Sequence, residues 1–468
     1  MKIIYIFLLI SFTNASSQSL QEKLSTAMEK LATDSQFLHA SMSMYVVETK
    51  TGKTLYSKNE ELGMAPASCQ KIVTSISAFE MLNKNFTYKT TISYDGNISN
   101  GILSGNIIID GSGDPSLGSW RWPQTKRELL FARLLAALKK KNINKIQGGI
   151  YVNDLNFSFQ PLPDGWIWQD IGNYYGAGAW GFNWNENHYD LNLRPGKNKG
   201  DETAIISTSP IDLKNEITNL LTTGAKGSGD NAYIYAAPFS DHLFVTGTIP
   251  AGEEKFSVSG SMPNPPLYFA KTLTEYFSKN NITTNGVAES NSNILMKKSR
   301  APLSMQRMDS IISPTLDSIN YWFLKKSVNL FGEAFVKTIG YQKIKQGNTD
   351  SGIAIIRNFW ESRGIDKSSL KIIDGSGLSP ANRITTKALV SMLQYATSKN
   401  WFPSFYNALP IINGIHMKDG YINGVRSYSG YIKNSNGIEH IFSFIINNFD
   451  GNPGTVREKM WHLLDILK

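Results

Sequence analysis

A chain of 468 residues is too long for one compact hydrophobic core, so we expect two or three domains. Hydrophobic residues make up 41% of the chain and charged residues 18%, a balance that excludes an intrinsically disordered protein. The formal net charge is +9, but the basic residues are dispersed and no nucleic-acid-binding module accompanies them, so we expect no nucleic-acid partner.

The first residues have the plan of a secretory signal peptide. Lys2 precedes an apolar run over residues 3–12, and small residues follow at 15–17. The run is too short for a permanent membrane anchor; an uncleaved anchor or a buried first strand is the alternative. We expect residues 1–17 to be cleaved and the mature protein to be secreted to the periplasm, with at most peripheral membrane contact.

The next elements are a helix, a hairpin and a second helix. Apolar residues recur at helical spacing over residues 20–35, and residues 40–57 alternate around a turn at Thr51-Gly52. The second helix is amphipathic and has Ser68 at its start, where backbone N–H groups are unpaired and the helix dipole is positive.

The middle of the chain differs in character from its two ends. Strands and glycine-marked turns dominate residues 89–305. After them helical periodicity returns, and a glycine-rich strand region follows at 416–448. We therefore predict an α+β fold in which residues 18–88 and 306–468 form one domain and residues 89–305 are a large, strand-rich insert.

Three short motifs occur in order along the chain. They are Ser68-Cys69-Gln70-Lys71, Ser327-Val328-Asn329 and Lys418-Asp419-Gly420. Each motif is common by itself, but the order S-x-x-K, S-x-N, K-x-G is the arrangement that serine acyl-transfer enzymes acting on D-alanyl peptides and penicillins use.

The residue types of the first two motifs suit acyl transfer, which needs a nucleophile, a base and donors for an oxyanion. Ser68 is the candidate nucleophile. Lys71 lies one helical turn away and is the candidate base, provided that burial and neighbouring cations lower its pKa. Ser327 and Asn329, on a loop, would relay a proton to the leaving amine and hold the substrate amide.

The third motif, predicted on a strand, would complete the site. Lys418 would add positive charge near Lys71 and the substrate. The backbone N–H groups of Ser68 and Tyr421 would form the oxyanion hole, and Asp419, Gly420 and Tyr421 would line the substrate position.

Other chemistries lack their signatures. Cys69, the single cysteine, lies two residues from Lys71 and so off its helical face, which predicts a core residue and not a nucleophile. No G-x-S-x-G elbow is present, and the six histidines show no metal-ligand spacing. We expect neither a Ser-His-Asp hydrolase nor a metal site.

With their flanking segments, the motifs resemble the class C low-molecular-mass penicillin-binding proteins, the D-alanyl-D-alanine carboxypeptidase/endopeptidases. The similar segments are residues 67–71, 113–117, 166–175, 256–263, 374–379 and 424–427. The resemblance implies a penicillin-recognising serine transpeptidase-like domain, an antiparallel sheet covered by helices, with the insert between the first two motifs. It also implies hydrolysis of peptidoglycan stem peptides through an acyl-serine without a cofactor, and inhibition by β-lactams.

The same resemblance assigns a role to the aromatic loop at residues 166–175, which in relatives borders the substrate cleft. It implies that Asp170 binds the free amine of a diamino-acid side chain in the stem peptide, with Tyr175 beside it. A loop cap or a surface charge is the alternative for Asp170.

The third motif departs from the family at two positions. The family commonly has Thr or Ser where this chain has Asp419, and often Thr where it has Tyr421; those hydroxyls can bind the terminal carboxylate of the substrate. Two like charges ~4 Å apart repel by roughly 4 kcal/mol at an effective dielectric near 20. Lys418 and Arg426 would offset part of this repulsion.

The departure leaves three functions open. The first is an active carboxypeptidase/endopeptidase, which the retained motif residues favour. The second is a catalytically weak or inactive peptidoglycan-binding scaffold of the same fold, which Asp419 favours. The third is a β-lactamase-like hydrolase, which the long insert disfavours.

Overall fold

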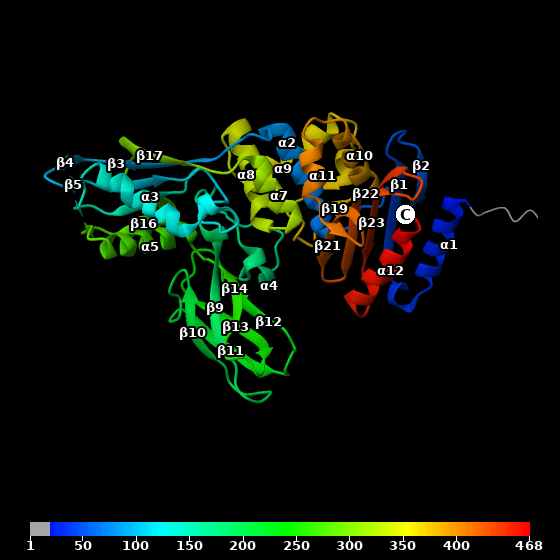
Figure 1. Ribbon diagram of the computed structural model, residues 1–468, viewed down its shortest axis with the longest axis horizontal. Helices are drawn as coiled ribbons and strands as arrows, with labels where there is room; N and C mark the ends of the chain where they lie inside the picture. Colours follow the sequence, from blue (N-terminus) through cyan, green and yellow to red (C-terminus); the bar gives the residue numbers. More distant parts are fainter. Residues whose placement is uncertain (1–18) are drawn as a thin grey trace, which may run out of the picture.

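The computed structural model describes residues 19–468, so the predicted signal peptide at 1–17 lies outside the described residues. Figure 1 shows a main domain of a large sheet with many helices, which contains both ends of the described chain, and an insert that extends away from it. Within residues 19–468, no helix has the length and apolar character needed to cross a membrane.

The main domain is built on a six-stranded antiparallel sheet with the strand order β2-β1-β23-β22-β21-β20. Its first strand pairs along its whole length with its last, so the sheet forms only when both ends of the chain come together. The strands are β1 (Ser41–Glu48), β2 (Thr54–Lys58), β20 (Ile411–Ile412), β21 (Ile415–Ile422), β22 (Val425–Lys433) and β23 (Glu439–Asn447).

Helices cover both faces of this sheet. Two of them, α1 (Leu20–Ala32) and α12 (Pro453–Asp465), pack on one face with Phe442 and Phe444 of β23. Ile441 and Ile445 point to the opposite face because side chains alternate along a strand. The helices on that side are α2 (Lys71–Leu82), α7 (Leu316–Lys325), α8 (Asn329–Ile344), α9 (Thr349–Glu361), α10 (Thr386–Thr397) and α11 (Phe402–Ala408).

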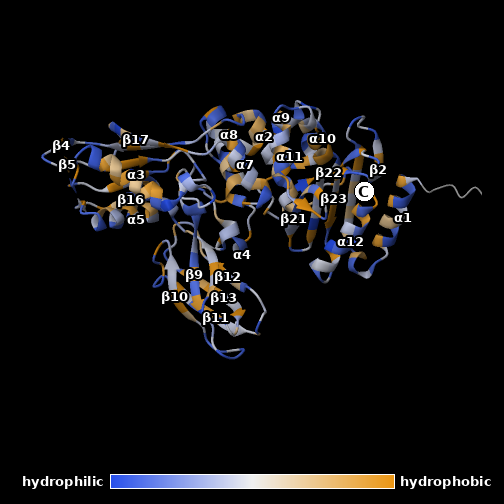
Figure 2. Cartoon of the chain, viewed as in Figure 1, coloured by the Kyte–Doolittle hydropathy of each residue, from blue (hydrophilic) through white to orange (hydrophobic). Residues whose placement is uncertain are grey.

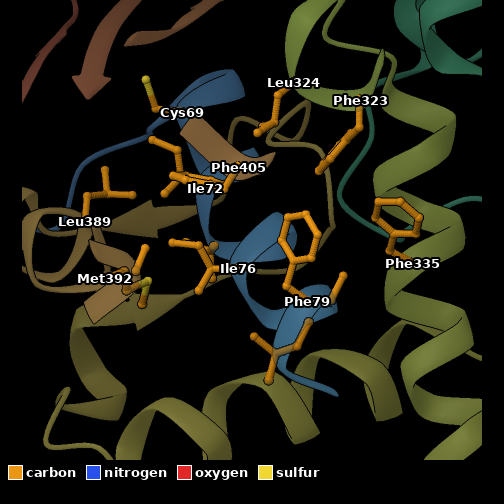
Figure 3. Close-up of a cluster of buried hydrophobic side chains, with 14 of the residues drawn as sticks. Cys69, Ile72, Ile76, Phe79, Phe323, Leu324, Phe335, Leu389, Met392 and Phe405 are labelled. Carbon is orange, nitrogen blue, oxygen red and sulfur yellow. The ribbon is translucent and has the colours of Figure 1, made fainter. Parts of the chain in front are cut away.

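Helix α2 is the centre of this helical layer. Nearly all of its residues are buried, because it contacts α7, α8 and α10. Figure 3 shows Ile72, Ile76 and Phe79 of α2 among side chains from the surrounding elements. Apolar residues gather where the helices meet each other and the sheet, as Figure 2 shows. The predicted α+β class is therefore confirmed.

The insert contains four small sheets, with the strand orders β16-β8-β6-β3-β17, β15-β7-β5-β4, β10-β9-β14 and β11-β13-β12. One apolar cluster joins them, so the insert has a core of its own. Its strands are β3 (Lys89–Tyr94), β4 (Asn97–Ser99), β5 (Ile102–Ser104), β6 (Ile107–Asp110), β7 (Lys145–Ile146), β8 (Ile150–Asn153), β9 (His188–Arg194), β10 (Ala204–Ser209), β11 (Ile217–Gly224), β12 (Asn231–Tyr235), β13 (Leu243–Pro250), β14 (Phe256–Ser261), β15 (Thr283–Thr284), β16 (Ala288–Ser290) and β17 (Gln306–Ile312).

Helices and short 3₁₀ turns complete the two parts. The insert helices are α3 (Arg127–Lys140), α4 (Trp168–Ile171), α5 (Pro265–Lys279) and α6 (Asn291–Met296). A two-stranded sheet in the main domain consists of β18 (Leu370–Lys371) and β19 (Arg383–Ile384). The 3₁₀ turns are η1 (Ser35–Phe37), η2 (Ala67–Gln70), η3 (Pro123–Thr125), η4 (Tyr174–Gly176), η5 (Asn185–Asn187) and η6 (Lys367–Ser369).

Strand β17 pairs with the insert, although the expected boundary between the insert and the main domain at residue 306 would place it in the main domain. The sequence led us to begin the second part of the main domain at residue 306, yet β17 pairs with β3 of the insert from Gln306 to Ile312. Strand pairing over this length attaches the segment to the insert sheet. We therefore propose residues 89–312 as the insert and residues from about 313 onward as the return to the main domain.

Candidate active site

The first motif forms a tight turn at the start of α2. Ser68 lies at the start of the helix as predicted, in the 3₁₀ turn η2, which continues directly into α2 at Lys71. The i, i+3 relation still holds, because Lys71 Nζ lies 2.9 Å from Ser68 Oγ. Ala67 has a φ of 45°, a left-handed conformation that is strained for a residue with a Cβ and often occurs at functional sites.

Lys71 is fully buried and has three hydrogen-bond acceptors. Besides Ser68 Oγ, its Nζ donates to Asn329 Oδ1 at 2.7 Å and to the carbonyl of Ser376 at 2.7 Å. Burial and, after it, the nearby Lys418 ammonium lower the pKa of Lys71 to about 7. A lysine with this pKa is partly neutral near pH 7 and can accept a proton from Ser68.

The second motif lies at the junction of α7 and α8. Asn329 was expected on a loop, but it is the first residue of α8; its Nδ2 donates to the carbonyl of Tyr175 at 2.8 Å. One amide therefore joins Lys71 to the insert. Ser327 precedes the helix with a φ of 56° and lines the cavity described below.

The third motif lies on β21, as predicted. Lys418 is 1% exposed, and its Nζ donates to Asp419 Oδ1 at 2.8 Å and to the Asp419 carbonyl at 2.7 Å. Burial alone would raise the pKa of Asp419, but the Lys418 ammonium and, more weakly, Arg426 hold it below its usual value. Asp419 is thus a carboxylate paired with the lysine of its own motif.

Gly420 allows β21 to pass close to the Ser68 turn. A Cβ at this position would lie 2.7 Å from the Pro66 carbonyl oxygen and 2.8 Å from the Ser68 nitrogen, so no larger residue fits without a shift of backbone. Tyr421 follows Gly420 on β21 and is 48% exposed. The Arg426 guanidinium lies 4.7 Å from the centroid of its ring.

The aromatic loop brings Asp170 and Tyr175 together, with Tyr175 Oη 3.4 Å from Asp170 Oδ1. Burial raises the pKa of Asp170, and no ion pair joins it to a cation within residues 19–468. Burial and the Asp170 carboxylate also raise the pKa of Tyr175 well above its usual value. A half-buried carboxylate without a cationic neighbour is suited to receive a cationic ligand.

Sequence reasoning missed a buried carboxylate that supports Lys71. Asp374 accepts bonds from several donors and thereby folds the loop 374–379 so that the Ser376 carbonyl reaches Lys71. The donors are Gln70 Nε2 at 2.8 Å, Trp166 Nε1 at 2.9 Å, Asn382 Nδ2 at 3.0 Å and the backbone N–H groups of Gly377 at 2.8 Å and Ser379 at 2.7 Å. The segment was recognised by resemblance, but its sequence gave no sign of these distant partners.

A second missed carboxylate lies on α8. Glu333 is fully buried and accepts the backbone N–H of Gly375; burial, with the nearby Asp374 carboxylate, raises its pKa. Its signal was present, since Glu333 and Lys337 are charged residues at helical spacing in an otherwise apolar stretch, and buried charges are rare unless they have partners.

Cys69 packs in the core as predicted. Its Sγ donates to the Lys418 carbonyl at 3.1 Å, and burial raises the pKa of the thiol to about 11. The thiol is therefore protonated near pH 7, which makes it a poor nucleophile. Within residues 19–468 no three His, Cys, Asp or Glu side chains gather as a metal site would require.

A cavity of about 840 Å³ adjoins the second motif, where the insert meets the main domain. The segment Lys326–Leu330 forms one wall, and residues of the insert form the others. Ser327, Asn329 and Tyr175 line it, whereas Ser68, Lys71 and Asp170 do not, so the cavity adjoins the second motif and extends away from Ser68.

Comparisons with known proteins agree with this geometry. The chain is 25% identical over 436 residues to a D-alanyl-D-alanine carboxypeptidase of an Actinomadura species, covering 87% of this chain and 77% of that protein. It is 24% identical to the D-alanyl-D-alanine carboxypeptidase DacB of Haemophilus influenzae, covering 82% and 81% of the two chains.

The fold also matches solved structures. A crystal structure of penicillin binding protein 4 from Haemophilus influenzae aligns with a TM-score of 0.79 at 22% identity, covering 94% of this chain and 97% of that one. The same protein complexed with a β-lactam aligns with a TM-score of 0.74 at 21% identity, covering 95% and 99%. The predicted penicillin-recognising fold is thus confirmed.

The model of the D-Ala-D-Ala carboxypeptidase 3 (S13) family matches residues 24–414, most of the chain. This protein therefore belongs to the D-Ala-D-Ala carboxypeptidase 3 (S13) family and is a serine-type carboxypeptidase, a hydrolase.

Proposed function

We propose that Ser68 and Lys71 carry the reaction of this carboxypeptidase on the stem peptides of peptidoglycan. The observation that supports this most directly is the 2.9 Å contact between Ser68 Oγ and the buried Lys71 Nζ. Neutral Lys71 takes the proton of Ser68 as Oγ attacks the carbonyl of the penultimate D-alanine. The N–H groups of Ser68 and Tyr421 are the proposed donors to the oxyanion.

The remaining motif residues serve the leaving group and the substrate. The proton taken by Lys71 passes through Ser327 to the amine of the departing D-amino acid, and Lys418 stabilises the charge that develops. Water then hydrolyses the ester on Ser68. Asn329, which Tyr175 and Lys71 hold between them, orients the substrate amide. A β-lactam would acylate Ser68 by the same attack, because its ring carbonyl replaces the peptide carbonyl.

Export to the periplasm is part of the same proposal. Peptidoglycan lies outside the cytoplasmic membrane, and the first residues have the charge and apolar pattern of a secretory signal. The alternative function, a catalytically weak or inactive peptidoglycan-binding scaffold, depended on repulsion between Asp419 and the terminal carboxylate of the substrate. The ion pair of Asp419 with Lys418 removes part of that repulsion.

Acylation of Ser68 is the direct test. Incubation with a fluorescent penicillin should give one covalent adduct, which peptide mass analysis places on Ser68, together with release of D-alanine from a pentapeptide. Ser68→Ala should abolish both, whereas Cys69→Ala should retain the adduct because the buried thiol is protonated. An adduct that persists in Ser68→Ala would refute the assignment.

The pH dependence of acylation tests Lys71 as the base. Only the neutral amine accepts a proton, so the acylation rate should fall as the pH drops through about 7. Lys418→Met removes a cation that lowers the pKa of Lys71, so the midpoint should move to higher pH even if the maximal rate also falls. Lys387→Met, at an exposed ion pair with Glu61, is the control and should leave the midpoint in place. An unchanged midpoint in Lys418→Met would contradict the proposed coupling.

Asp170 is tested with two pentapeptides that differ only in the side-chain amine of the diamino acid, free in one and acetylated in the other. Asp170→Asn should lower kcat/KM roughly tenfold for the free amine, because a charged hydrogen bond is lost. It should leave the acetylated peptide nearly unchanged, and Tyr175→Phe, which keeps the carboxylate, should have a smaller effect. Equal losses on both peptides would exclude a role in recognising the amine.

Asp419 is tested with peptides that end in a free carboxylate or in an amide. Asp419→Thr removes the like charge and supplies a hydroxyl, so it should raise kcat/KM for the carboxylate peptide by roughly tenfold or more. The amidated peptide should gain little. Asp419→Asn separates the two causes, because it removes the charge without adding a hydroxyl. A lower rate on the carboxylate peptide in both variants would mean that the Lys418–Asp419 pair is itself needed.

A further inference from the structure

The cavity beside the second motif has a row of aromatic rings along its wall. The ring centroid of His188 lies 4.7 Å from that of Trp120 and 6.4 Å from that of Tyr174. Trp120 is 46% exposed and Tyr174 56% exposed, so both rings present apolar surface to solvent within a concave site. Burial lowers the pKa of His188, which keeps the central ring neutral near pH 7.

A rigid scaffold holds this row. The buried Glu186 carboxylate accepts bonds from Ser119 Oγ at 2.6 Å and from Arg121 Nε at 2.7 Å and Nη2 at 3.0 Å. Arg121 in turn lies 5.6 Å from the Trp120 ring centroid. Trp120 is thus positioned beside a largely buried ion pair, whose two residues also line the cavity.

Backbone strain marks the same turn. Asn185, Glu186 and Asn187 have φ values of 53°, 51° and 54°, three consecutive left-handed residues, none of them glycine. A left-handed residue with a Cβ is strained and persists only where the surrounding structure enforces it. Here the Asn187 side chain enforces it through bonds to the Gly178 carbonyl and to Asn183 Oδ1. Strain of this kind concentrates at binding and catalytic sites.

The other walls supply polar groups. The lining includes two exposed lysines, Lys126 and Lys326, and Asp190, which accepts a bond from Ser259 Oγ at 2.7 Å. A wall of apolar ring faces with hydrogen-bonding groups at its edges matches a pyranose, which has C–H groups on its faces and hydroxyl or amide groups around its rim. The volume lies in the range of pockets that enclose a ligand of this size.

We propose that this cavity is a saccharide subsite, which binds the sugar of the glycan strand to which the stem peptide is attached. The inference rests on the proposed function, since that function brings the stem peptide to Ser68. The segment Lys326–Leu330 forms a wall of the cavity and includes Asn329, which bonds to Lys71, so a substrate that extends past Asn329 enters the cavity. Asn329 lines the cavity, and its Oδ1 lies 2.7 Å from Lys71 Nζ, which is 2.9 Å from Ser68 Oγ. Each extended residue spans up to about 3.5 Å, so a stem of a few residues reaches from Ser68 to the cavity.

The test compares two substrates, a pentapeptide attached to its N-acetylglucosaminyl-N-acetylmuramyl disaccharide and the same pentapeptide without sugar. The wild-type protein should have the higher kcat/KM on the disaccharide peptide. Trp120→Ala should reduce the ratio of the two values by roughly fivefold to tenfold, because a ring contact is lost. Phe159→Ala, at an aromatic residue of the insert that is 48% exposed and outside the cavity, is the matched control and should leave the ratio unchanged.

A binding measurement separates this inference from the catalytic proposal. Calorimetric titration of the Ser68→Ala protein with the disaccharide alone should detect binding that Trp120→Ala, added to it, weakens. Equal kcat/KM for the two substrates in the wild type, or an unchanged ratio in Trp120→Ala, would overturn the saccharide subsite while penicillin acylation of Ser68 still supported the proposed function. Loss of that acylation would instead count against the proposed function.

Discussion

The site depends on one buried amine, Lys71 Nζ, and its three hydrogen bonds. The acceptors come from three different parts of the chain: Ser68 in the same turn, Asn329 on α8 and the carbonyl of Ser376. A lysine removed from water in this way is unfavourable as a free ion, so its pKa falls and each donor requires a partner. The packing of α2 against α8 and the fold of the loop 374–379 therefore have to be accurate, because an error in either would leave a buried donor unsatisfied.

The insert is part of this arrangement and not only an appendage. The Tyr175 carbonyl accepts from Asn329, and Trp166 donates to Asp374, so two contacts from one aromatic loop support the two elements that hold Lys71. The same loop carries Asp170 on one side and Tyr174, beside the aromatic cavity, on the other. The aromatic loop of the insert and the buried Lys71 of the main domain are thus structurally connected.

Charge in the third motif is balanced locally. Lys418 is nearly inaccessible to solvent and bonds to Asp419, while its charge also lowers the pKa of Lys71. Asp419 acts in the opposite direction on Lys71, so the pair together moderates the field at the amine. The aspartate therefore affects the protonation of Lys71.

The sequence by itself determined the features that depend on residues close to each other in the chain. The i, i+3 placement of Ser68 and Lys71, the alternation of the strands and the core position of Cys69 follow from helical and strand periods, and all appear in the structure. Only the tertiary structure decided the partners of Lys71 that lie 258 and 305 residues away, the Asp374 network and the orientation of Lys418 towards Asp419. Such contacts are selected by packing and by the need to satisfy buried polar groups, and neither leaves a local pattern in the chain.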